Sequence, residues 1–451
     1  MDRTLAVEAN EKIGEKITLY GWINTVRDHG KISFYDLRDI SGIIQTVSKK
    51  SYEVSQEDVV KIEGTVKERP QNLVNLNIPT GKIEIEIENL EIISKSQTPP
   101  FPIDTEGIDI EEALRLKYRY LDLRRPRLHQ NIKMRHKMIS AMRRFLTDRN
   151  FTEIETPILT KATPEGARDF LVPSRLQPGK FYALPQSPQQ YKQLLMVAGF
   201  ERYFQIARCF RDEDPRADRA YGEFTQLDIE MSFVEQEDIL KLTEELFKEI
   251  TEKVFKKKLL EYPFPRVKHK DALEKYGTDK FDMRKDKNPN VLAFAFVVDF
   301  PLFEKTPNQP ISPSHHPFTA PLPQDVELLD KDPMKVRSLQ HDLVCNGLEV
   351  GGGSIRITDA NIQRKIFEIL GYKKAEIEEK FGHLLSAFNY GVPPHGGIAP
   401  GIERLLMVAL GEQSTREVTA FPMTSSGQTA VMDAPSPVDN NTLKELDLKL
   451  K

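Results

Sequence analysis

Three arginines in this sequence stand in surroundings that suit an anionic ligand. Arg211 opens a charged loop, Arg356 follows a run of three glycines, and Arg404 lies in the first turn of a predicted helix behind glycine. A guanidinium binds a carboxylate or a phosphate through two parallel hydrogen bonds, and a glycine-rich start of a helix suits phosphate. Each of these residues therefore suits a carboxylate or a phosphate group of a ligand.

The loop from Arg211 to Arg219 holds three arginines and four carboxylates in nine residues. A loop of this composition is typical of an exposed hairpin tip. The alternative interpretation is a site that grips a phosphate. The chain contains neither a GxGxxG nor a GxxxxGKS or GxxxxGKT string, so we exclude the Rossmann and P-loop nucleotide sites.

Two regular elements must hold this loop in place. Before it, Ser187 and Gln190 predict a capping box with proline at the first helical position, so Gln189 and Lys192 share one helix face. After it, residues 224–233 alternate in the manner of a strand. The apolar face comprises Leu227, Ile229, Met231 and Phe233, and the opposite face comprises Phe224, Gln226, Asp228 and Glu230.

Residues 1–95 predict an all-β domain, for which a five-stranded oligonucleotide-binding barrel is the natural candidate. The predicted strands are Ile17–Ile23, Lys31–Leu37, Gly42–Val47, Val59–Val66 and Gly81–Ile87. Arg27, Phe34 and Gln45 could form a base platform, with an arginine for phosphate, an aromatic ring for stacking and an amide for base edges. A plain barrel core with an ordinary turn explains the same residues equally well.

Residues 96–130 predict a linker or hinge, in which a proline-rich and an acidic stretch precede a segment dense in arginine and lysine. That basic segment, residues 115–135, favours either a solvated helix face or a basic hinge beside nucleic acid. A helix from Met134 to Asp148 and a strand from Phe151 to Pro157 follow. Further on, the apolar run from Val291 to Val298 predicts a buried strand.

Whole-chain composition limits the possible classes of protein. The 451 residues are too many for one core, so we expect two or three domains. The net charge of −4 does not indicate nucleic acid, so any such contact must come from local patches. The two cysteines form neither a metal spacing nor a disulfide framework, which suits a reducing cytoplasm. The longest apolar run is far too short to span a membrane.

Three of these stretches resemble, in order, the signature motifs of class II aminoacyl-tRNA synthetases. The helix and strand that end at Pro157 resemble motif 1, the FRDE string at Phe210 with the following strand resembles motif 2, and the GIER string at Gly401 resembles motif 3. Their order behind a barrel is the class IIb layout. Longer strings resemble the bacterial aspartyl-tRNA synthetase family over nearly the whole chain: TPEGARDF, LPQSPQQYKQLLM, FTQLDIE, HHPFTAP, EVGGGSIRI and PPHGGIAPGIER.

The resemblance implies an α+β protein of three parts. They are an OB-fold barrel of five strands that binds the anticodon (1–95), a linker or hinge (96–130), and a class II catalytic domain with an antiparallel sheet flanked by helices (131–451). It further implies a cytoplasmic homodimer with tRNA(Asp) as its partner. The family's large insertion domain has no room near residues 284–291, so we expect it to be missing.

In the implied reaction, aspartate and ATP give aspartyl-adenylate and pyrophosphate, and the terminal 3′-hydroxyl of the tRNA then attacks the adenylate. By resemblance Arg211, Glu213 and Arg404 are catalytic: Arg211 grips the α-phosphate, and Arg404 meets the γ-phosphate and covers the adenine. Asp342 and Glu349 match positions that hold Mg²⁺ through oxygen ligands. The implied ATP-binding residues are Arg211, Asp212, Glu213, Phe224, Glu349, Gly401, Ile402, Glu403 and Arg404.

Charge selects the amino acid in this family. The side-chain carboxylate of aspartate needs paired cations, which Lys192 and Arg356 supply, and asparagine would leave them unpaired at a cost of roughly 3–5 kcal/mol. The implied aspartate-binding residues are Glu165, Ser187, Gln189, Lys192, Arg211, Asp228, His315 and Arg356. In the barrel, Arg27, Phe34 and Gln45 match positions that contact the anticodon.

Two strings depart from the family pattern. The motif 2 loop reads Arg219-Ala220-Tyr221-Gly222-Glu223, where the family has a shorter Arg-Gln-Pro-Glu, so a glutamine that contacts ATP is missing. In the barrel, His29 resembles the relaxed form that also charges tRNA(Asn), whereas Asn72 stands where that form has glycine. Strict and relaxed reading of the anticodon both stay open.

The alternatives are an asparaginyl-tRNA synthetase and a non-catalytic tRNA-binding paralogue. Lys192 argues against the first, because a neutral amide needs no paired cations. The retained Arg211, Glu213, Glu349, Arg356 and Arg404 argue against the second. The barrel argues against a third reading, an asparagine-synthesising relative that lacks it.

Overall fold

A computed structural model describes residues 3–163, 165–219, 221–306 and 309–449 of the chain. Ala220, in the departing motif 2 loop, lies outside the described residues. The chain divides into two compact units, Met1–Ile110 and Glu111–Lys451. The division falls inside the range 96–130, for which the sequence predicts a linker.

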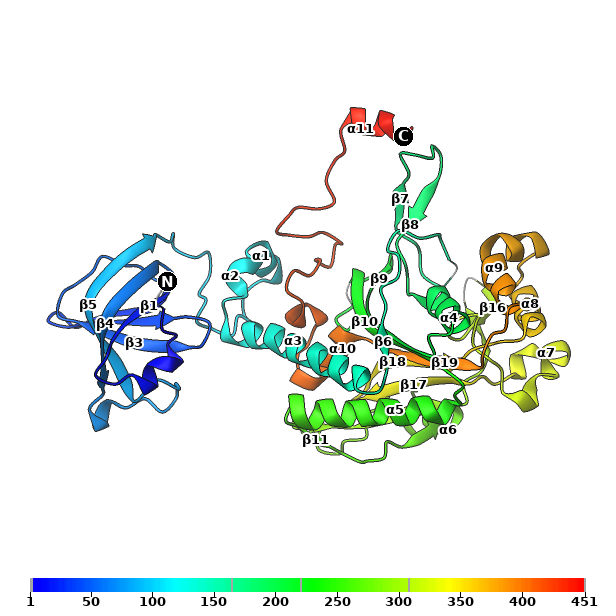
Figure 1. The fold of residues 1–451 in the computed structure, drawn as a ribbon, viewed down its shortest axis with the longest axis horizontal. Helices are drawn as coiled ribbons and strands as arrows, with labels where there is room; N and C mark the ends of the chain where they lie inside the picture. Colours follow the sequence, from blue (N-terminus) through cyan, green and yellow to red (C-terminus); the bar gives the residue numbers. More distant parts are fainter. Residues whose placement is uncertain (1–2, 164, 220, 307–308, 450–451) are drawn as a thin grey trace. The chain divides into compact units, whose positions relative to one another are not determined.

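Within the described residues, the N-terminal unit is a closed barrel of five strands in the order β1-β2-β3-β5-β4 (Figure 1), which confirms the predicted OB-fold barrel. The strands are β1 (Lys16–Asp28), β2 (Ser33–Arg38), β3 (Ile43–Ser48), β4 (Val59–Glu68) and β5 (Ile83–Ser94), with short helices η1 (Val7–Glu11) and η2 (Gln71–Leu73). Alternate side chains such as Leu19, Leu37 and Ile62 are buried in the interior, as period-2 alternation requires. The intervening residues are left for the outer face.

The second unit is built on an eight-stranded sheet, counted over the described residues, with the order β12-β14-β17-β18-β19-β10-β9-β6. Its strands are β6 (Thr152–Glu153), β9 (Arg202–Arg211), β10 (Gly222–Ser232), β12 (Arg266–Lys268), β14 (Phe294–Val298), β17 (Gln340–Cys345), β18 (Leu348–Ile355) and β19 (His395–Pro400). The central strands are antiparallel, as predicted, whereas the two edge pairs, β6 with β9 and β12 with β14, are parallel. Three two-stranded sheets lie outside it: β7 (Leu171–Pro173) with β8 (Phe181–Ala183), β11 (Lys258–Leu259) with β13 (Val291–Leu292), and β15 (Phe303–Thr306) with β16 (Gln309–Pro313).

Helices cover this sheet and the segments between its strands. They are α1 (Glu112–Lys117), α2 (Arg119–Asp122), α3 (Pro126–Thr147), α4 (Gln189–Val197), α5 (Gln236–Glu249), the π-helical turn η3 (Ile250–Val254), α6 (His269–Tyr276), η4 (Pro323–Asp325), α7 (Leu328–Lys331), η5 (Pro333–Lys335), α8 (Ala360–Ile369), α9 (Lys374–Phe388), α10 (Ile402–Leu410), η6 (Thr415–Val418) and α11 (Asn440–Glu445). No helix in the described ranges is both long and apolar enough to cross a lipid bilayer.

The main core lies between one face of the sheet and helices α3, α5 and α10, and Figure 1 shows α5 lying along the sheet. Leu227 and Ile229 of β10 pack in this core against side chains such as Phe145 of α3 and Leu405 of α10. Since successive side chains of a strand point to opposite faces, the polar side chains of β10 face away from the core. That second face carries the candidate site.

The predicted capping box at the start of α4 is wrong. The helix begins at Gln189, with proline as its N-cap. Ser187 instead donates its hydroxyl hydrogen to Glu165 Oε2 at 2.6 Å, and the buried amide of Gln190 has no hydrogen-bond partner among the described residues. The Oγ of Ser187 still accepts a hydrogen bond from the backbone N of Gln189 at 3.3 Å, so the predicted box lacks its partner in Gln190 rather than its serine.

Three predicted strands have other bounds in the structure than the sequence suggested. The apolar face of β10 ends at Met231, because Phe233 lies beyond the strand, has φ 58° and is 66% exposed. The run from Val291 to Val298 divides at Ala293: β13 pairs with β11, and β14 joins the main sheet. The predicted strand from Phe151 to Pro157 is reduced to β6.

The interpretation of the basic segment as a solvated face or a free basic hinge is wrong for its buried arginines. Arg119 Nη1 and Arg125 Nε lie 2.7 Å from the carboxylate of Asp122, and Arg115 Nη2 lies 3.1 Å from it. Arg115 also binds Glu417, at 2.9 Å. These charges are neutralised inside the second unit, where they tie α1 and α2 to η6.

The place predicted for the missing insertion domain is a short, internally bonded loop. Asp282 accepts hydrogen bonds from Nε and Nη2 of Arg284 at 3.1 and 2.9 Å. Arg284 Nη1 in turn donates to the carbonyl oxygen of Asn288 at 2.8 Å. The loop therefore closes on itself before β13 begins.

Candidate active site

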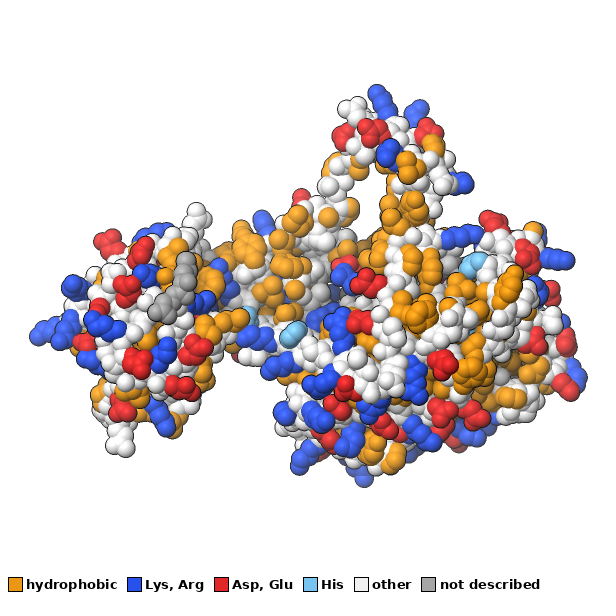
Figure 2. Space-filling model, in the orientation of Figure 1, with side chains coloured by type: hydrophobic (Ala, Val, Ile, Leu, Met, Phe, Trp, Pro, Cys, Tyr) orange, Lys and Arg blue, Asp and Glu red, His pale blue; other side chains and the backbone are white. Residues whose placement is uncertain are grey.

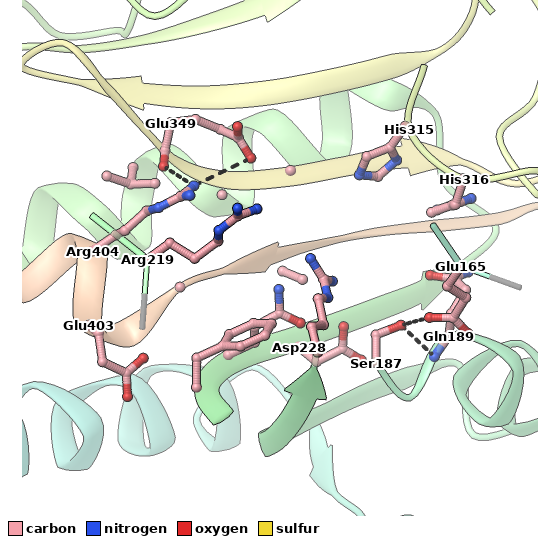
Figure 3. A pocket seen from close by; sticks show the side chains of 18 of the residues that line it. Glu165, Ser187, Gln189, Arg219, Asp228, His315, His316, Glu349, Glu403 and Arg404 are labelled. Atoms are coloured by element: carbon pink, nitrogen blue, oxygen red, sulfur yellow. Dashed lines mark hydrogen bonds and ion pairs between the residues drawn. The ribbon is translucent and has the colours of Figure 1, made fainter. Parts of the chain in front are cut away.

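A cavity of about 240 Å³ opens on the polar face of β10 and is bounded by β18, α4, α10 and the neighbouring loops (Figure 3). Most of the predicted site residues line it: Glu165, Ser187, Gln189, Lys192, Arg211, Glu213, Phe224, Asp228, His315, Glu349, Arg356, Gly401, Glu403 and Arg404. Of the residues predicted for the catalytic unit, Asp212, Asp342 and Ile402 do not line it. The sequence interpretation missed Asp218, Arg219, His316 and Thr415, which do.

One wall of the cavity holds four buried charged side chains, Lys192, Asp228, Glu230 and Arg356, which we call the buried charge cluster. Lys192 Nζ lies 2.6 Å from Asp228 Oδ1 and 3.3 Å from Glu230 Oε2. Arg356 binds both oxygens of Glu230, at 2.8 and 3.0 Å. Glu230 thus bridges the two cations and holds them side by side.

The pKa values of the two carboxylates of the cluster are shifted in opposite directions. Burial alone would raise the pKa of Glu230, but the charges of Arg356 and Lys192 lower it to about 2. For Asp228, burial outweighs the attraction of Lys192 and raises the pKa. Asp228 Oδ2 is buried without a hydrogen-bond partner in the described part of the chain, so it is an available acceptor for a ligand's ammonium group.

Next to the cluster lie the residues predicted to receive the ammonium group, and Figure 3 shows Glu165, Ser187 and Gln189 together at this end of the cavity. Besides Ser187, Glu165 accepts a hydrogen bond from Thr163 Oγ1 at 3.0 Å, and burial raises its pKa. Gln189 Nε2 donates to Gln193 at 3.1 Å. We call this part of the cavity, with the buried charge cluster, the buried end.

Two adjacent histidines close the buried end. His316 Nε2 lies 2.7 Å from Arg356 Nη1 and accepts its hydrogen. Burial and the neighbouring cations lower the pKa of His315 to about 3 and that of His316 well below its ordinary value. Both rings are therefore neutral at physiological pH, which lets His316 act as the acceptor.

The other part of the cavity, the open end, is formed by Asp218, Arg219, Glu349 and Arg404, and Figure 3 shows Arg219, Glu349 and Arg404 grouped there. Arg219 Nη1 lies 2.7 Å from Glu213 Oε2. Arg404 Nη2 lies 3.3 Å from Asp218 Oδ2, and its Nη1 lies 3.9 Å from Glu349 Oε1. The side chains of Arg219, Glu349 and Arg404 keep 31, 29 and 24% of their surface exposed.

Arg211 stands between the two ends and differs from the other cations of the cavity. Its Nε donates to the carbonyl oxygen of Gln186 at 3.4 Å, and its guanidinium lies over the ring of Phe224, 5.0 Å from the centroid. Among the described residues it has no carboxylate partner, whereas Lys192, Arg219, Arg356 and Arg404 each have one. Its charge is thus free for a ligand.

The predicted metal ligands, Asp342 and Glu349, stand on neighbouring strands. Burial and then the charge of Glu349 raise the pKa of Asp342 well above its ordinary value. Burial opposes ionisation of Glu349 too, but Lys280, at 3.1 Å, and Arg404 hold its pKa below its ordinary value. Two facing carboxylates, one of them short of a positive partner, fit a hard divalent cation that prefers oxygen ligands.

The side chains of Asp212, Ile402 and Glu403 are engaged by other parts of the protein. Asp212 accepts a hydrogen bond from Tyr221 at 3.1 Å, and Ile402 is buried in the main core. Although Glu403 borders the cavity, one of its oxygens accepts from Arg135 at 2.7 Å and the other from the backbone N of Thr225 at 3.0 Å. It thereby joins α3, β10 and α10.

The barrel carries the third predicted group of residues on its outer face. Arg27 Nη2 donates to Gln45 Oε1 at 3.1 Å and to Asp36 Oδ1 at 2.9 Å. Phe34 pairs with Arg27 in register, and the edge of the His29 ring lies against it at a centroid distance of 5.7 Å. None of Arg27, Phe34 and Gln45 belongs to the barrel core as described, and their contact with nucleic acid stays a prediction.

Sequence families match both units. The family model described as tRNA synthetases class II (D, K and N) matches residues 111–425. The model described as OB-fold nucleic acid binding domain matches residues 17–93. These matches confirm the fold class that the sequence predicts.

Curated relatives match nearly the whole chain. The aspartate–tRNA(Asp/Asn) ligase of Dehalococcoides mccartyi (strain CBDB1) is 40% identical over 585 aligned positions, which cover 98% of each chain. The ligase of the same name from Caldanaerobacter subterraneus subsp. tengcongensis is 41% identical and covers 97% of this chain and 96% of the relative. Because this chain has only 451 residues, the aligned relatives contain additional residues that it lacks.

Solved structures share the fold. Asparaginyl-tRNA synthetase from Pyrococcus horikoshii, complexed with asparaginyl-adenylate, has a TM-score of 0.77 and 25% identity and covers 94% of this chain and 98% of its own. Aspartyl-tRNA synthetase from Entamoeba histolytica has a TM-score of 0.74 and 23% identity, with 93 and 91% coverage. Together with the family match and the curated relatives, they show that the chain belongs to the class II aminoacyl-tRNA synthetases.

Proposed function

We propose that this chain is an aspartate–tRNA ligase: it activates L-aspartate with ATP and transfers it from aspartyl-adenylate to the 3′-hydroxyl of the terminal adenosine of tRNA. The observation that carries this proposal is the pair of buried cations, Lys192 and Arg356, that Glu230 holds side by side at the buried end. The names of the curated relatives support tRNA(Asp) and tRNA(Asn) as the two acceptors.

The buried end suits aspartate in three respects. Lys192 and Arg356 offer paired positive charge to the side-chain carboxylate, and Asp228 Oδ2 and Glu165 offer acceptors to the ammonium group. Because this wall excludes water, a ligand that leaves the two cations unsatisfied is rejected strongly. Asparagine, whose amide carries no charge, would leave Lys192 and Arg356 with only the carboxylates of Asp228 and Glu230 as partners.

The region around Arg211 suits formation of the adenylate. Attack of the aspartate carboxylate on the α-phosphate develops negative charge on the phosphate oxygens and on the departing pyrophosphate. Arg211, free of any carboxylate among the described residues, neutralises the α-phosphate, while Arg404 serves the γ-phosphate and the adenine. The rate then arises from positioning and electrostatic stabilisation, without a covalent enzyme intermediate.

Mg²⁺ accompanies ATP in this proposal. Asp342 and Glu349 would hold it, and the cation would neutralise the charge of the phosphates. Within the described ranges, no group of three or more histidine, cysteine, aspartate or glutamate side chains is placed to hold a metal ion by itself.

We also propose that the protein is a homodimer and works in the cytoplasm. In this proposal the barrel (1–95) binds the anticodon, residues 96–130 form the linker, and residues 131–451 form the catalytic domain. The hairpin β7–β8 supports the dimer: its apolar side chains Leu171, Leu176 and Phe181 are 58, 76 and 46% exposed, and Figure 2 shows hydrophobic side chains covering this hairpin. A second copy would cover such a surface. Both cysteines are unpaired, which suits a reducing compartment.

Aspartate-dependent exchange of pyrophosphate into ATP tests the first step, with asparagine as the comparison substrate. We expect exchange with aspartate and at least a hundredfold less with asparagine. Charging of tRNA(Asp) and tRNA(Asn) transcripts then tests the second step. Absence of aspartate-dependent exchange would refute the enzyme assignment, and charging of tRNA(Asp) alone would refute the second acceptor.

A further inference from the structure

Arg404 is held at its edge by main-chain as well as side-chain atoms. Its Nε donates to the carbonyl oxygen of Asp218 at 3.0 Å, and its Nη1 donates to the carbonyl oxygen of Glu349 at 3.1 Å. The third nitrogen, Nη2, faces Asp218 Oδ2 at 3.3 Å. Every nitrogen of the planar group is thus engaged along its rim, which fixes the orientation of the plane.

The loop that carries Asp218 is itself fixed. Arg216 and Arg219 exchange backbone hydrogen bonds at 2.9 and 3.1 Å, so Ala217 and Asp218 form the tip of a tight turn. The carbonyl oxygen of Ala217 accepts from the backbone N of Thr415 at 3.0 Å. Since Thr415 is buried at the start of η6, which contacts α10, the turn is attached next to the helix that carries Arg404.

We propose that Asp218 is a positioning residue that sets the plane of Arg404 as a stacking surface for the adenine base. No aromatic ring among the described residues covers Arg404, so its face is available to a ligand. A guanidinium whose rim is satisfied still attracts a π-system through its face. This inference rests on the proposed function, because it assumes that ATP occupies the open end.

An alternative reading of the same contacts is that Asp218 only occupies Arg404 until the γ-phosphate displaces it. Two contacts argue against this reading. The carbonyl oxygens of Asp218 and Glu349 cannot leave Arg404 without movement of a docked turn and of strand β18. A phosphate could replace only the ion pair with Asp218 Oδ2, and by taking over that contact it would keep Nη2 engaged, whereas removal of the Asp218 carboxylate leaves Nη2 without a partner.

The test uses Asp218→Ala and Asp218→Asn, with Asp214→Ala as the control. Asp214 lies in the same loop and has the same charge, but its side chain is exposed and has no contact with Arg404. The probes are adenosine and inorganic pyrophosphate, because adenosine has the base without phosphates and pyrophosphate has phosphates without the base. Equilibrium binding of each probe is measured on the full-length protein, and the KM for ATP is measured in the exchange assay.

We expect Asp218→Ala to weaken the binding of adenosine and to raise the KM for ATP about tenfold, with less than a twofold change for pyrophosphate. Asp218→Asn keeps an acceptor oxygen, so its effect should be about threefold. Asp214→Ala should change nothing. A thermal unfolding scan of each variant verifies that the fold is retained.

Three results would overturn the inference. They are unchanged binding of adenosine by Asp218→Ala, a loss confined to pyrophosphate, and tighter binding of ATP, which would show that Asp218 competes with the nucleotide. Failure of the proposed function gives a different result: the unmodified protein would show no aspartate-dependent exchange, whatever the binding of adenosine.

Discussion

The two ends of the cavity hold their charges in different ways. At the buried end, the side chains of the buried charge cluster are at most 2% exposed and form ion pairs with one another. At the open end, Arg219, Glu349 and Arg404 keep about a quarter to a third of their surface. Buried ion pairs are costly to break, whereas exposed pairs contribute little. The buried end can therefore select one amino acid strictly. At the open end, the arginines can give up their carboxylate partners when a nucleotide binds.

Arg211 should show the largest effect, because it serves the ligand without a carboxylate of its own. We expect Arg211→Ala to lower aspartate-dependent exchange about 100–1000-fold and to leave the free energy of unfolding within about 0.5 kcal/mol. Arg208→Ala, which removes an arginine of the same strand that is 54% exposed, is the matched control. Urea unfolding measures the stability. A loss of stability in Arg211→Ala large enough to account for the loss of exchange would show that Arg211 is structural.

Lys192 tests the buried end itself. Lys192→Met leaves Asp228 and Glu230 without their shared cation, so we expect a loss of about 3–5 kcal/mol in the free energy of unfolding. The KM for aspartate should rise at least a hundredfold, because the pair of cations is broken. Binding of ATP, measured by calorimetry, should remain. If ATP binding fell as far as aspartate use, the separation between the two ends would be wrong.

Glu230 makes the buried end dependent on pH. Its pKa of about 2 lies below the ordinary 4.5, so its ionised form stabilises the fold fully above about pH 4.5, and this contribution disappears as the pH falls towards 2. The shift corresponds to about 3 kcal/mol. Urea unfolding between pH 2 and 5 should show a steep dependence in the unmodified protein and a shallower one in Glu230→Gln. Parallel curves would mean that other groups account for the dependence.

Arg27 should show the smallest effect, since it lies in the other unit. We expect Arg27→Ala to raise the KM for tRNA about tenfold through the loss of one phosphate or base contact and to leave aspartate-dependent exchange unchanged. The control is Lys16→Ala, because Lys16 is a barrel lysine that is 75% exposed. A change in exchange would show that the barrel influences the catalytic unit directly.

Patterns within short stretches predicted much of this molecule. Alternation along β10 predicted that Phe224 and Asp228 share the face that lines the cavity, while Leu227 faces the core. Alternation in the barrel likewise predicted its strands. These predictions succeed because the repeat of two depends only on backbone geometry and on one buried face.

Predictions failed where the partner of a residue lies far away in the sequence. The sequence assigned Ser187 only to a helix cap, whereas its hydroxyl hydrogen is donated to Glu165, which lies in another loop. The sequence predicted a basic hinge for the arginines after residue 114, but in the structure Arg115 binds Glu417, which lies some three hundred positions later. The role of Asp218 in orienting Arg404 was hidden for the same reason. No local pattern records such pairs, and only the folded chain brings them together.

The loop from Asp282 to Asn288, which is held by hydrogen bonds within itself, is a position where the chain can accept an insertion; we call it the joint. Before the loop Phe281 stacks on Tyr276 at a centroid distance of 4.3 Å, and after it β13 pairs with β11, so both ends are anchored without it. The entropic cost of lengthening such a loop grows only by about 0.6 kcal/mol per doubling. Whole domains can therefore be gained or lost at this joint during evolution without disturbing the site, and a reporter protein can be inserted there by design.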